Sequence, residues 1–192
     1  MPRTPRNTKQ RIVDTAYRVF YKEGFNRARL DVIAETAGVS KRTLYYHFTS
    51  KDALLAAVLD AQHELALARF QNWLDPDIDN PAEIVRVLFK EFAAWTRSPA
   101  WQGSGFTRSV MELADLPGHP SRAAARRHKA AVETWLAERL SGTSLANANQ
   151  IARQIVLLLE GCHALILIHG DQAYATAAAE AAQLLVGSHA PS

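Results

Sequence analysis

The stretch from Leu30 to Leu55 constrains the fold most, because it has the pattern of two short helices joined by a tight turn and followed by a third helix. Apolar residues recur at helical spacing on one side of each of the first two helices, at Ile33, Ala34, Ala37, Leu44 and Phe48. Between the two helices, Gly38 tolerates the positive φ of a sharp turn, and the Ser40 hydroxyl can accept a backbone N–H of the next helix. The pattern predicts a helix-turn-helix, whose second helix enters the major groove of DNA.

The second of these helices, residues 41–48, carries side chains that can donate hydrogen bonds around its buried apolar pair. These side chains are Lys41, Arg42, Thr43, Tyr45, Tyr46 and His47. A short helix that is merely solvated would more commonly include Glu, Asp or Gln, and none of these occurs between residues 41 and 48. The composition favours a DNA-reading surface over a solvated one.

The charge distribution supports the same interpretation. The chain of 192 residues has a formal net charge of +3. Residues 1–60 carry 11 Lys and Arg against 6 Asp and Glu, whereas the remaining residues carry 11 against 13. The positive excess therefore lies with the helix-turn-helix, as phosphate binding requires. The basic start of the chain is either a disordered tail or an arm whose Arg3 and Arg6 reach phosphates or the minor groove.

Four motifs occur in this region in a characteristic order and spacing, namely Ile33-Ala34, Ala37-Gly38-Val39-Ser40, Leu44-Tyr45-Tyr46-His47-Phe48 and Ser50-Lys51-Asp52-Ala53-Leu54. In these motifs the chain resembles the tetracycline-repressor (TetR) family of bacterial transcription regulators, over residues 8–58. One departure lies at the start of the first of the two helices, where the family usually has Ser or Thr and this chain has Ala28 and Arg29. Arg29 would supply a phosphate contact in place of the missing hydroxyl.

The resemblance implies roles for individual residues of the second helix. It implies that Lys41, Arg42 and Thr43 face base edges, with Arg42 where many family members have glycine. It also implies that the side chains of the second half, together with Lys51, hold phosphates. The expected DNA-binding set is Arg29, Ser40, Lys41, Arg42, Thr43, Tyr45, Tyr46, His47 and Lys51.

Helical patterns continue through the rest of the chain and predict an all-α fold. A long helix follows Ser50 and ends at Asp75, and Asn80-Pro81 with Glu83 forms an N-terminal helix signal with a cap, a first-turn proline and a reciprocal acid. Further helices are expected at residues 81–98, 106–114, 120–140, 146–169 and 173–186. We expect a three-helix DNA-binding domain at residues 1–58 and a helical ligand-binding and dimerisation domain at residues 59–192.

The last two helices predict a homodimer. The second half of residues 146–169 is apolar nearly all round, and a helix that is apolar on all faces must be buried on all faces. The final helix carries small residues that allow helices to approach closely, at Ala177, Ala178, Ala181 and Ala182. These features suit a two-fold four-helix contact between subunits, although an intramolecular core is the alternative. A dimer sets two recognition helices about 34 Å apart, so that they read a palindromic operator in double-stranded DNA.

The resemblance also implies a small-molecule effector. Family members generally enclose a ligand cavity among their middle helices, and the ligand moves the long linking helix so that the DNA-binding heads no longer fit the grooves. All four tryptophans lie outside the DNA-binding part, and aromatic walls with a few polar groups are typical of such pockets, although tryptophans are also ordinary core residues. The expected ligand-binding residues are Trp95, Trp101, Arg108, Glu112, His128, Trp135, Glu160 and His163.

Two of these residues, Glu160 and His163, lie three apart in the most apolar helix and share one face. Burying them without a partner is costly. Three interpretations are open for this pair: an internal hydrogen bond, ligand recognition, or half of a metal site. No Cys/His cluster at metal-ligand spacing completes a metal site. We expect neither a metal nor another cofactor. The single cysteine, Cys162, excludes an intramolecular disulfide, and its apolar surroundings do not support a redox role.

Other functional classes explain less of the chain. An enzyme is not expected, because neither a Gly-x-Ser-x-Gly elbow nor a phosphate-binding glycine loop occurs. A sequence-blind architectural DNA-binding protein would leave the C-terminal helices without a role, and a protein that binds DNA only with a co-ligand stays open. No apolar N-terminal segment and no uncharged apolar run of membrane-spanning length occurs, which predicts a cytoplasmic protein without a membrane partner. We expect a repressor that a small apolar or aromatic molecule releases from its operator.

Overall fold

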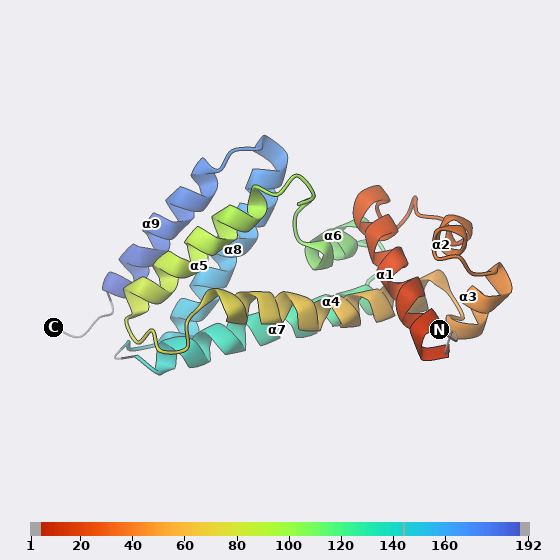
Figure 1. The fold of residues 1–192 in the computed structure, drawn as a ribbon. Helices are drawn as coiled ribbons and strands as arrows, with labels where there is room; N and C mark the ends of the chain where they lie inside the picture. Colours follow the sequence, from red (N-terminus) through yellow and green to blue (C-terminus); the bar gives the residue numbers. More distant parts are fainter. Residues whose placement is uncertain (1–4, 144, 189–192) are drawn as a thin grey trace. The chain divides into compact units, whose positions relative to one another are not determined.

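The computed structural model describes residues 5–143 and 145–188, with side chains from Asn7 onward. Every regular element in these residues is an α-helix, which confirms the predicted all-α fold (Figure 1). The helices are α1 (Pro5–Glu23), α2 (Leu30–Thr36), α3 (Lys41–His47), α4 (Lys51–Trp73), α5 (Pro81–Thr96), α6 (Gly105–Glu112), α7 (Pro120–Ser141), α8 (Ala148–His169) and α9 (Ala173–Gly187). Helix α1 begins at Pro5, so the basic start of the chain is partly helical; Arg3 and the side chain of Arg6 lie outside the described part of the chain.

The helices pack as two compact units. The first unit contains the chain up to residue 65 together with residues 104–127, and the second contains residues 66–103 and the chain from residue 128. Helices α4 and α7 each contribute to both units. The packing units therefore do not coincide with the predicted boundary between residues 58 and 59, because α6 and the start of α7 pack with the N-terminal helices.

The core of the first unit closes around the helix-turn-helix. Ile12 of α1, Ile33 of α2, Leu44 of α3 and Leu54 of α4 are all at most 1% exposed. The turn between α2 and α3 has the predicted left-handed residue, since Gly38 has a φ of +61°. The guanidinium of Arg11 donates to the Ala37 carbonyl at 2.8 Å, and this bond attaches α1 to the end of α2.

The core of the second unit is built from α5, α8 and α9 and from parts of α4 and α7. Helix α9 packs along both α5 and α8, and Leu88, Ile155 and Ala182 are completely buried. Of the four alanines expected at a subunit contact, Ala178 and Ala182 are buried within the chain, so the close approach they allow is at least partly intramolecular.

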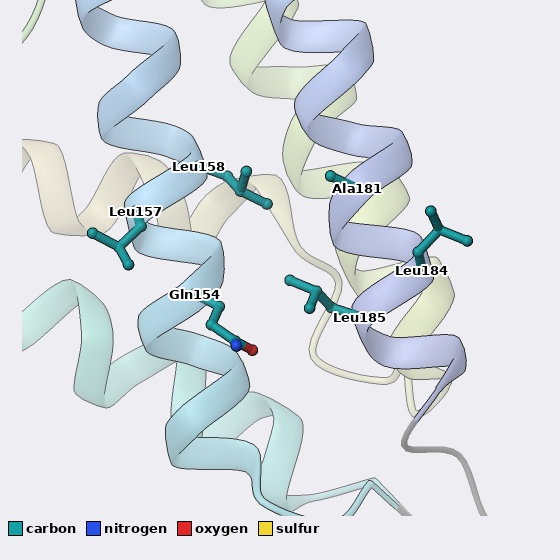
Figure 2. A pocket seen from close by; sticks show the side chains of 6 residues that line it. All are labelled: Gln154, Leu157, Leu158, Ala181, Leu184 and Leu185. Atoms are coloured by element: carbon teal, nitrogen blue, oxygen red, sulfur yellow. The ribbon is translucent and has the colours of Figure 1, made fainter.

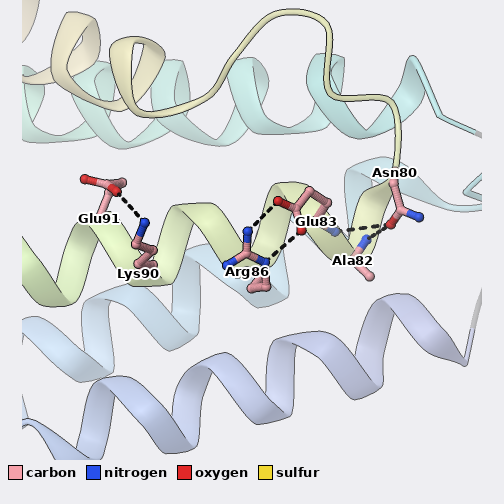
Figure 3. Close-up of polar contacts among 6 residues, drawn as sticks. All are labelled: Asn80, Ala82, Glu83, Arg86, Lys90 and Glu91. Atoms are coloured by element: carbon pink, nitrogen blue, oxygen red, sulfur yellow. Dashed lines mark hydrogen bonds and ion pairs between the residues drawn. The ribbon is translucent and has the colours of Figure 1, made fainter.

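The start of α5 shows one predicted capping bond and lacks another. The Asn80 side chain accepts hydrogen bonds from the backbone N–H groups of Ala82 and Glu83, as expected for a helix cap (Figure 3). The Glu83 carboxylate does not return to Asn80 as the reciprocal acid, because both of its oxygens bind the guanidinium of Arg86. Arg86, three residues later on the same face of α5, thus binds the carboxylate in place of the Asn80 backbone N–H.

Helix α8 bears on the expectation about membrane-spanning length. It has 22 residues and contains an 18-residue window with a mean hydropathy of 1.8, so by length and composition alone it is long and apolar enough to cross a membrane. The expectation considered only uncharged runs, and the charged Arg153 and Glu160 divide this helix. Core helices of globular proteins have the same composition, and here Ile151, Ile155 and Ile166 are buried in the second unit.

The left-handed turn at Gly38 gives a direct stability test. A methyl group at this position meets nothing within 4 Å, so Gly38→Ala changes the backbone energy and not the packing. We expect the free energy of unfolding to fall by about 1 kcal/mol, because L-residues disfavour this conformation. The matched control is Gly118→Ala, because a methyl group at Gly118 also has no neighbour within 4 Å and the φ of Gly118 is not positive. Equal denaturant midpoints for the two variants would contradict the strained turn.

Candidate nucleic-acid interface and effector region

Helix α3 presents the predicted donor surface because its two faces differ sharply. Leu44 is 1% exposed and anchors the helix from beneath. On the opposite side, Lys41, Arg42, Tyr45 and Tyr46 are exposed, and Tyr46 reaches 83%. A helix of 7 residues is too short to be stable alone, so this burial is what holds the exposed side chains in place.

The N-terminus of α3 is capped as predicted. The Ser40 hydroxyl accepts the backbone N–H of Thr43 at 3.0 Å and also shares a hydrogen bond of 2.8 Å with the Thr43 hydroxyl. The remaining free N–H groups of the first turn and the helix dipole make this end favourable for a phosphate. Ser40 and Thr43 are thus part of the helix start, and their hydroxyls are already engaged with each other.

An acidic residue faces two of the expected DNA contacts. The Asp31 carboxylate lies 2.7 Å from the Lys41 ammonium and 3.7 Å from the Arg29 guanidinium. Arg29 occupies the N-cap position of α2 and makes no side-chain capping bond there. All three side chains are substantially exposed, so these ion pairs are weak and a DNA phosphate can compete for the cations.

Lys51 differs from the other expected DNA contacts because its ammonium is held inside the first unit. Its Nζ donates to the Asn26 carbonyl at 3.1 Å and lies 4.5 Å from the centre of the Phe25 ring. Partial burial lowers the pKa of Lys51, and the carboxylates of Glu112 and Asp52 act in the opposite direction. The Lys51 side chain thus connects α4 to the loop between α1 and α2. His47, another expected DNA contact, is also half-buried and packs edge-on against Tyr46.

In the second unit, the structure brings four of the expected ligand-binding residues together, since Trp95, Trp101 and Glu160 all lie against His163, with the Glu160 carboxylate 3.6 Å from its Nδ1. The His163 ring stacks on Trp101 with ring centres 6.2 Å apart, and Trp95 contacts it edge-on at 5.8 Å. Phe92 contacts the same imidazole at 4.9 Å. The Trp101 indole N–H is buried and has no hydrogen-bond partner among the described residues. We call Phe92, Trp95, Trp101 and His163 the aromatic cluster.

His163 is neutral in this environment. Its Nδ1 lies 3.0 Å from the Leu159 carbonyl, which can only accept, so Nδ1 carries the proton. Burial lowers the pKa of His163 to about 4, and the charge of Lys129 adds to this effect, while Glu160 and the Leu159 hydrogen bond oppose it. Glu160 is bound to the Lys129 ammonium, so both residues have a partner within the chain.

Comparison with known proteins identifies the N-terminal region. Residues 12–58 match the family model of the bacterial regulatory proteins of the tetR family. These residues are a TetR-family N-terminal domain.

Curated and solved members of the TetR family show how far the similarity extends. The chain is 41% identical to the HTH-type transcriptional regulator UidR of Escherichia coli K12 over 64 residues, which is 33% of each chain. It is 46% identical to TtgR of Pseudomonas putida over 57 residues, 30% of this chain and 27% of TtgR. The match thus spans about a third of the length of these relatives.

Solved structures extend the likeness of fold to almost the whole chain. A TetR-family transcriptional regulator from Streptomyces coelicolor has a TM-score of 0.84 at 24% identity, with 96% of both chains covered. A TetR transcriptional regulator from Chloroflexus aurantiacus has a TM-score of 0.81 at 19% identity, also with 96% of both chains covered. The C-terminal helices therefore share the fold of TetR-family proteins.

The other expected ligand-binding residues lie elsewhere. Arg108 and Glu112 belong to the first unit, where their side chains bind the backbone of Tyr21 and of Phe25 and Asn26. Trp135 contacts Phe70, with ring centres 6.2 Å apart. His128 is 3% exposed and belongs to the second unit.

Residues that the sequence did not single out complete the surroundings of the aromatic cluster. The Arg69 guanidinium lies 4.8 Å from the centre of the Trp95 ring, and Trp73 contacts the same ring at 6.0 Å. Arg69 and Trp73 are four residues apart on α4, and Phe92 and Trp95 are three apart on α5. This helical spacing could have identified them from the sequence, because residues three or four apart lie on the same face of a helix.

Cys162 is a buried free thiol. Burial raises the pKa of the Cys162 thiol to about 11, and its sulfur donates to the Tyr174 carbonyl at 3.4 Å. A thiol with this pKa is a poor nucleophile at neutral pH. Within residues 5–143 and 145–188, no group of three His, Cys, Asp or Glu residues is positioned to hold a metal ion.

The lowered pKa of His163 predicts a stability change in acid. Between pH 6.5 and about 4, the unfolded chain binds a proton at His163 and the folded protein does not. The free energy of unfolding therefore falls as the pH is lowered through this window, with a contribution on the order of 3 kcal/mol. Denaturant titrations of the wild-type protein and of His163→Phe should diverge in pH dependence over this range. Parallel profiles would contradict a buried neutral His163.

Proposed function

We propose that this protein is a ligand-responsive, dimeric transcriptional regulator that binds a palindromic operator. The observation that carries the proposal is the exposed donor surface of α3, with Arg42, Tyr45 and Tyr46 on a helix held by the buried Leu44. Such a helix matches the major groove in width and can offer bidentate contacts to base edges. In this proposal the protein acts in the cytoplasm and is a regulator, not an enzyme.

A dimer is supported by an apolar surface on α8 and α9. Leu157 and Leu184 are 67% and 76% exposed in the single chain. Both side chains line an open groove of about 430 Å³ (Figure 2). The residues that line this groove are Gln154, Leu157, Leu158, Ala181, Leu184 and Leu185. We call this surface the α8–α9 face. Exposed apolar surface of this kind commonly belongs to an interface, and a two-fold contact between copies would bury it.

The aromatic cluster is the proposed effector region. The buried indole N–H of Trp101 offers a donor without a partner, and the neutral His163 lies against the same ring. A small aromatic molecule with a hydrogen-bond acceptor would suit these groups. Release from DNA requires the effector to prefer the conformation that does not bind DNA, and reversing a 99:1 population takes about 5.5 kcal/mol of preference.

Two alternatives give different binding behaviour. A sequence-blind architectural protein would bind all duplexes alike and lose affinity steeply with salt. A co-ligand-dependent binder would select an operator only in the presence of the small molecule. The exposed Arg42 favours sequence selection, because a guanidinium on the recognition helix can pair with guanine in a bidentate manner.

Substitutions in α3 test the proposed division between base and phosphate contacts. We expect Arg42→Ala to lower affinity for the preferred duplex by about tenfold or more, with little loss on a scrambled duplex, because one bidentate base contact is worth about 1–3 kcal/mol. Tyr46→Phe should weaken binding to both duplexes alike, because it removes a side-chain hydroxyl that would contact a phosphate. Fluorescence anisotropy on the two duplexes measures both effects. Equal losses on both duplexes for both variants would refute the division.

The α8–α9 face can be tested by a charge substitution. Leu184→Glu leaves the exposed side chain in solvent in a monomer, but it would bury two carboxylates in a two-fold dimer. We expect the dimer dissociation constant to rise by at least about a hundredfold, as measured by sedimentation velocity. The control is Leu116→Glu, because Leu116 is exposed outside α8 and α9. A dimer unaffected by Leu184→Glu would contradict the proposed interface.

A further inference from the structure

The loop between α1 and α2 is held by a carboxylate from α6, which lies beside the end of α1 (Figure 1). The Glu112 Oε2 accepts the backbone N–H of Phe25 at 2.8 Å, and its Oε1 accepts that of Asn26 at 2.7 Å. The Asn26 side chain donates in return to the Glu112 carbonyl at 3.2 Å. Two consecutive backbone donors therefore meet the two oxygens of one ionised group, which makes both hydrogen bonds charge-assisted.

Gly24 makes room for this carboxylate. Its φ is +86°, and a Cβ at this position would lie 3.1 Å and 3.3 Å from the two Glu112 oxygens. The absence of a side chain therefore serves both the turn at the end of α1 and the approach of Glu112. The Ala28 N–H donates to the Gly24 carbonyl at 3.2 Å, so the same residue also shapes the path of the chain into α2.

Two further side chains attach to the same corner. Arg108, one helical turn before Glu112, donates to the Tyr21 carbonyl at 3.0 Å, and its guanidinium lies 5.4 Å from the centre of the Tyr21 ring. Lys51, at the start of α4, donates to the Asn26 carbonyl. The corner between α1 and α2 is thus bound by α6 on one side and by the helix that follows α3 on another.

We propose that Glu112 is a positioning residue for DNA binding: its carboxylate fixes the α1–α2 loop and thereby the orientation of α2 and of the recognition helix α3. Helix α2 packs on both α1 and α3, so the loop that leads into α2 influences the whole helix-turn-helix. Glu112 itself makes no contact with DNA in this account. The inference rests on the proposed DNA-binding function and goes beyond it in assigning α6 a role in DNA affinity.

The sign of the effect distinguishes positioning from simple electrostatics. A carboxylate in the DNA-binding unit repels phosphates, so its neutralisation alone should tighten DNA binding. Positioning predicts the opposite result, because Glu112→Gln places an amide NH₂ where one of two backbone donors needs an acceptor. Asp115→Asn removes the same charge three residues away, at an exposed side chain for which no partner is observed among the described residues, and serves as the matched control.

The first experiment measures binding of the full-length variants to the preferred duplex by anisotropy. We expect Glu112→Gln to bind about tenfold more weakly than the wild-type protein, and Asp115→Asn to bind equally well or more tightly. Glu112→Asp keeps the charge but shortens the side chain by about 1.5 Å, and it should also weaken binding. Equal or tighter binding by both Glu112 variants would overturn the proposal.

The second measurement is independent of DNA. Backbone amide hydrogen exchange at Phe25 and Asn26 should be at least about tenfold faster in Glu112→Gln than in Asp115→Asn, with melting curves showing that both variants are folded. Unchanged exchange at these two amides would overturn the proposal even if DNA binding were weakened. If the wild-type protein selected no duplex, the DNA-binding function would fail by itself, and the exchange rates would still decide whether Glu112 holds the loop.

Discussion

The burial of Leu44 on the inner face of α3, which packs on α2, is the interaction on which the DNA-binding unit depends. A helix this short gains its stability from tertiary packing and not from its own hydrogen bonds. Because Leu44 and Phe48 take the inner face, the donor side chains have only the outer face left. The left-handed Gly38 brings α2 and α3 close enough for this packing, and the Ser40 cap starts α3 immediately afterwards.

Features that depend on residues close together in the sequence could be predicted, whereas contacts between distant residues could not. Helix limits, the turn at Gly38 and the caps at Ser40 and Asn80 depend on neighbours within a few residues, and the structure shows them. The partners of Glu112 lie 87 and 86 residues away, at Phe25 and Asn26. No spacing rule connects such positions, so Arg108 and Glu112 could only be interpreted from composition, as ligand contacts. Likewise, the stacking of His163 on Trp101 depends on how the chain folds back after α5.

The second unit combines two requirements in one helix. Helix α8 buries one side among α5 and α9, at residues such as Ile155 and Ala152, while Leu157 on another side stays exposed. A helix that is apolar on opposite sides fits a core and an interface at once, which is also why its hydropathy reaches that of membrane-spanning segments.

Sequence-specific DNA binding is tested by selecting bound fragments from random double-stranded DNA with the purified protein and then measuring affinities across a salt series. We predict selection of a palindromic sequence whose half-sites lie about one helical turn, roughly 34 Å, apart. Its affinity should exceed that of scrambled DNA at every salt concentration. Salt-steep binding without sequence preference, unchanged when the selection is repeated with cell extract as a source of co-ligand, would contradict it.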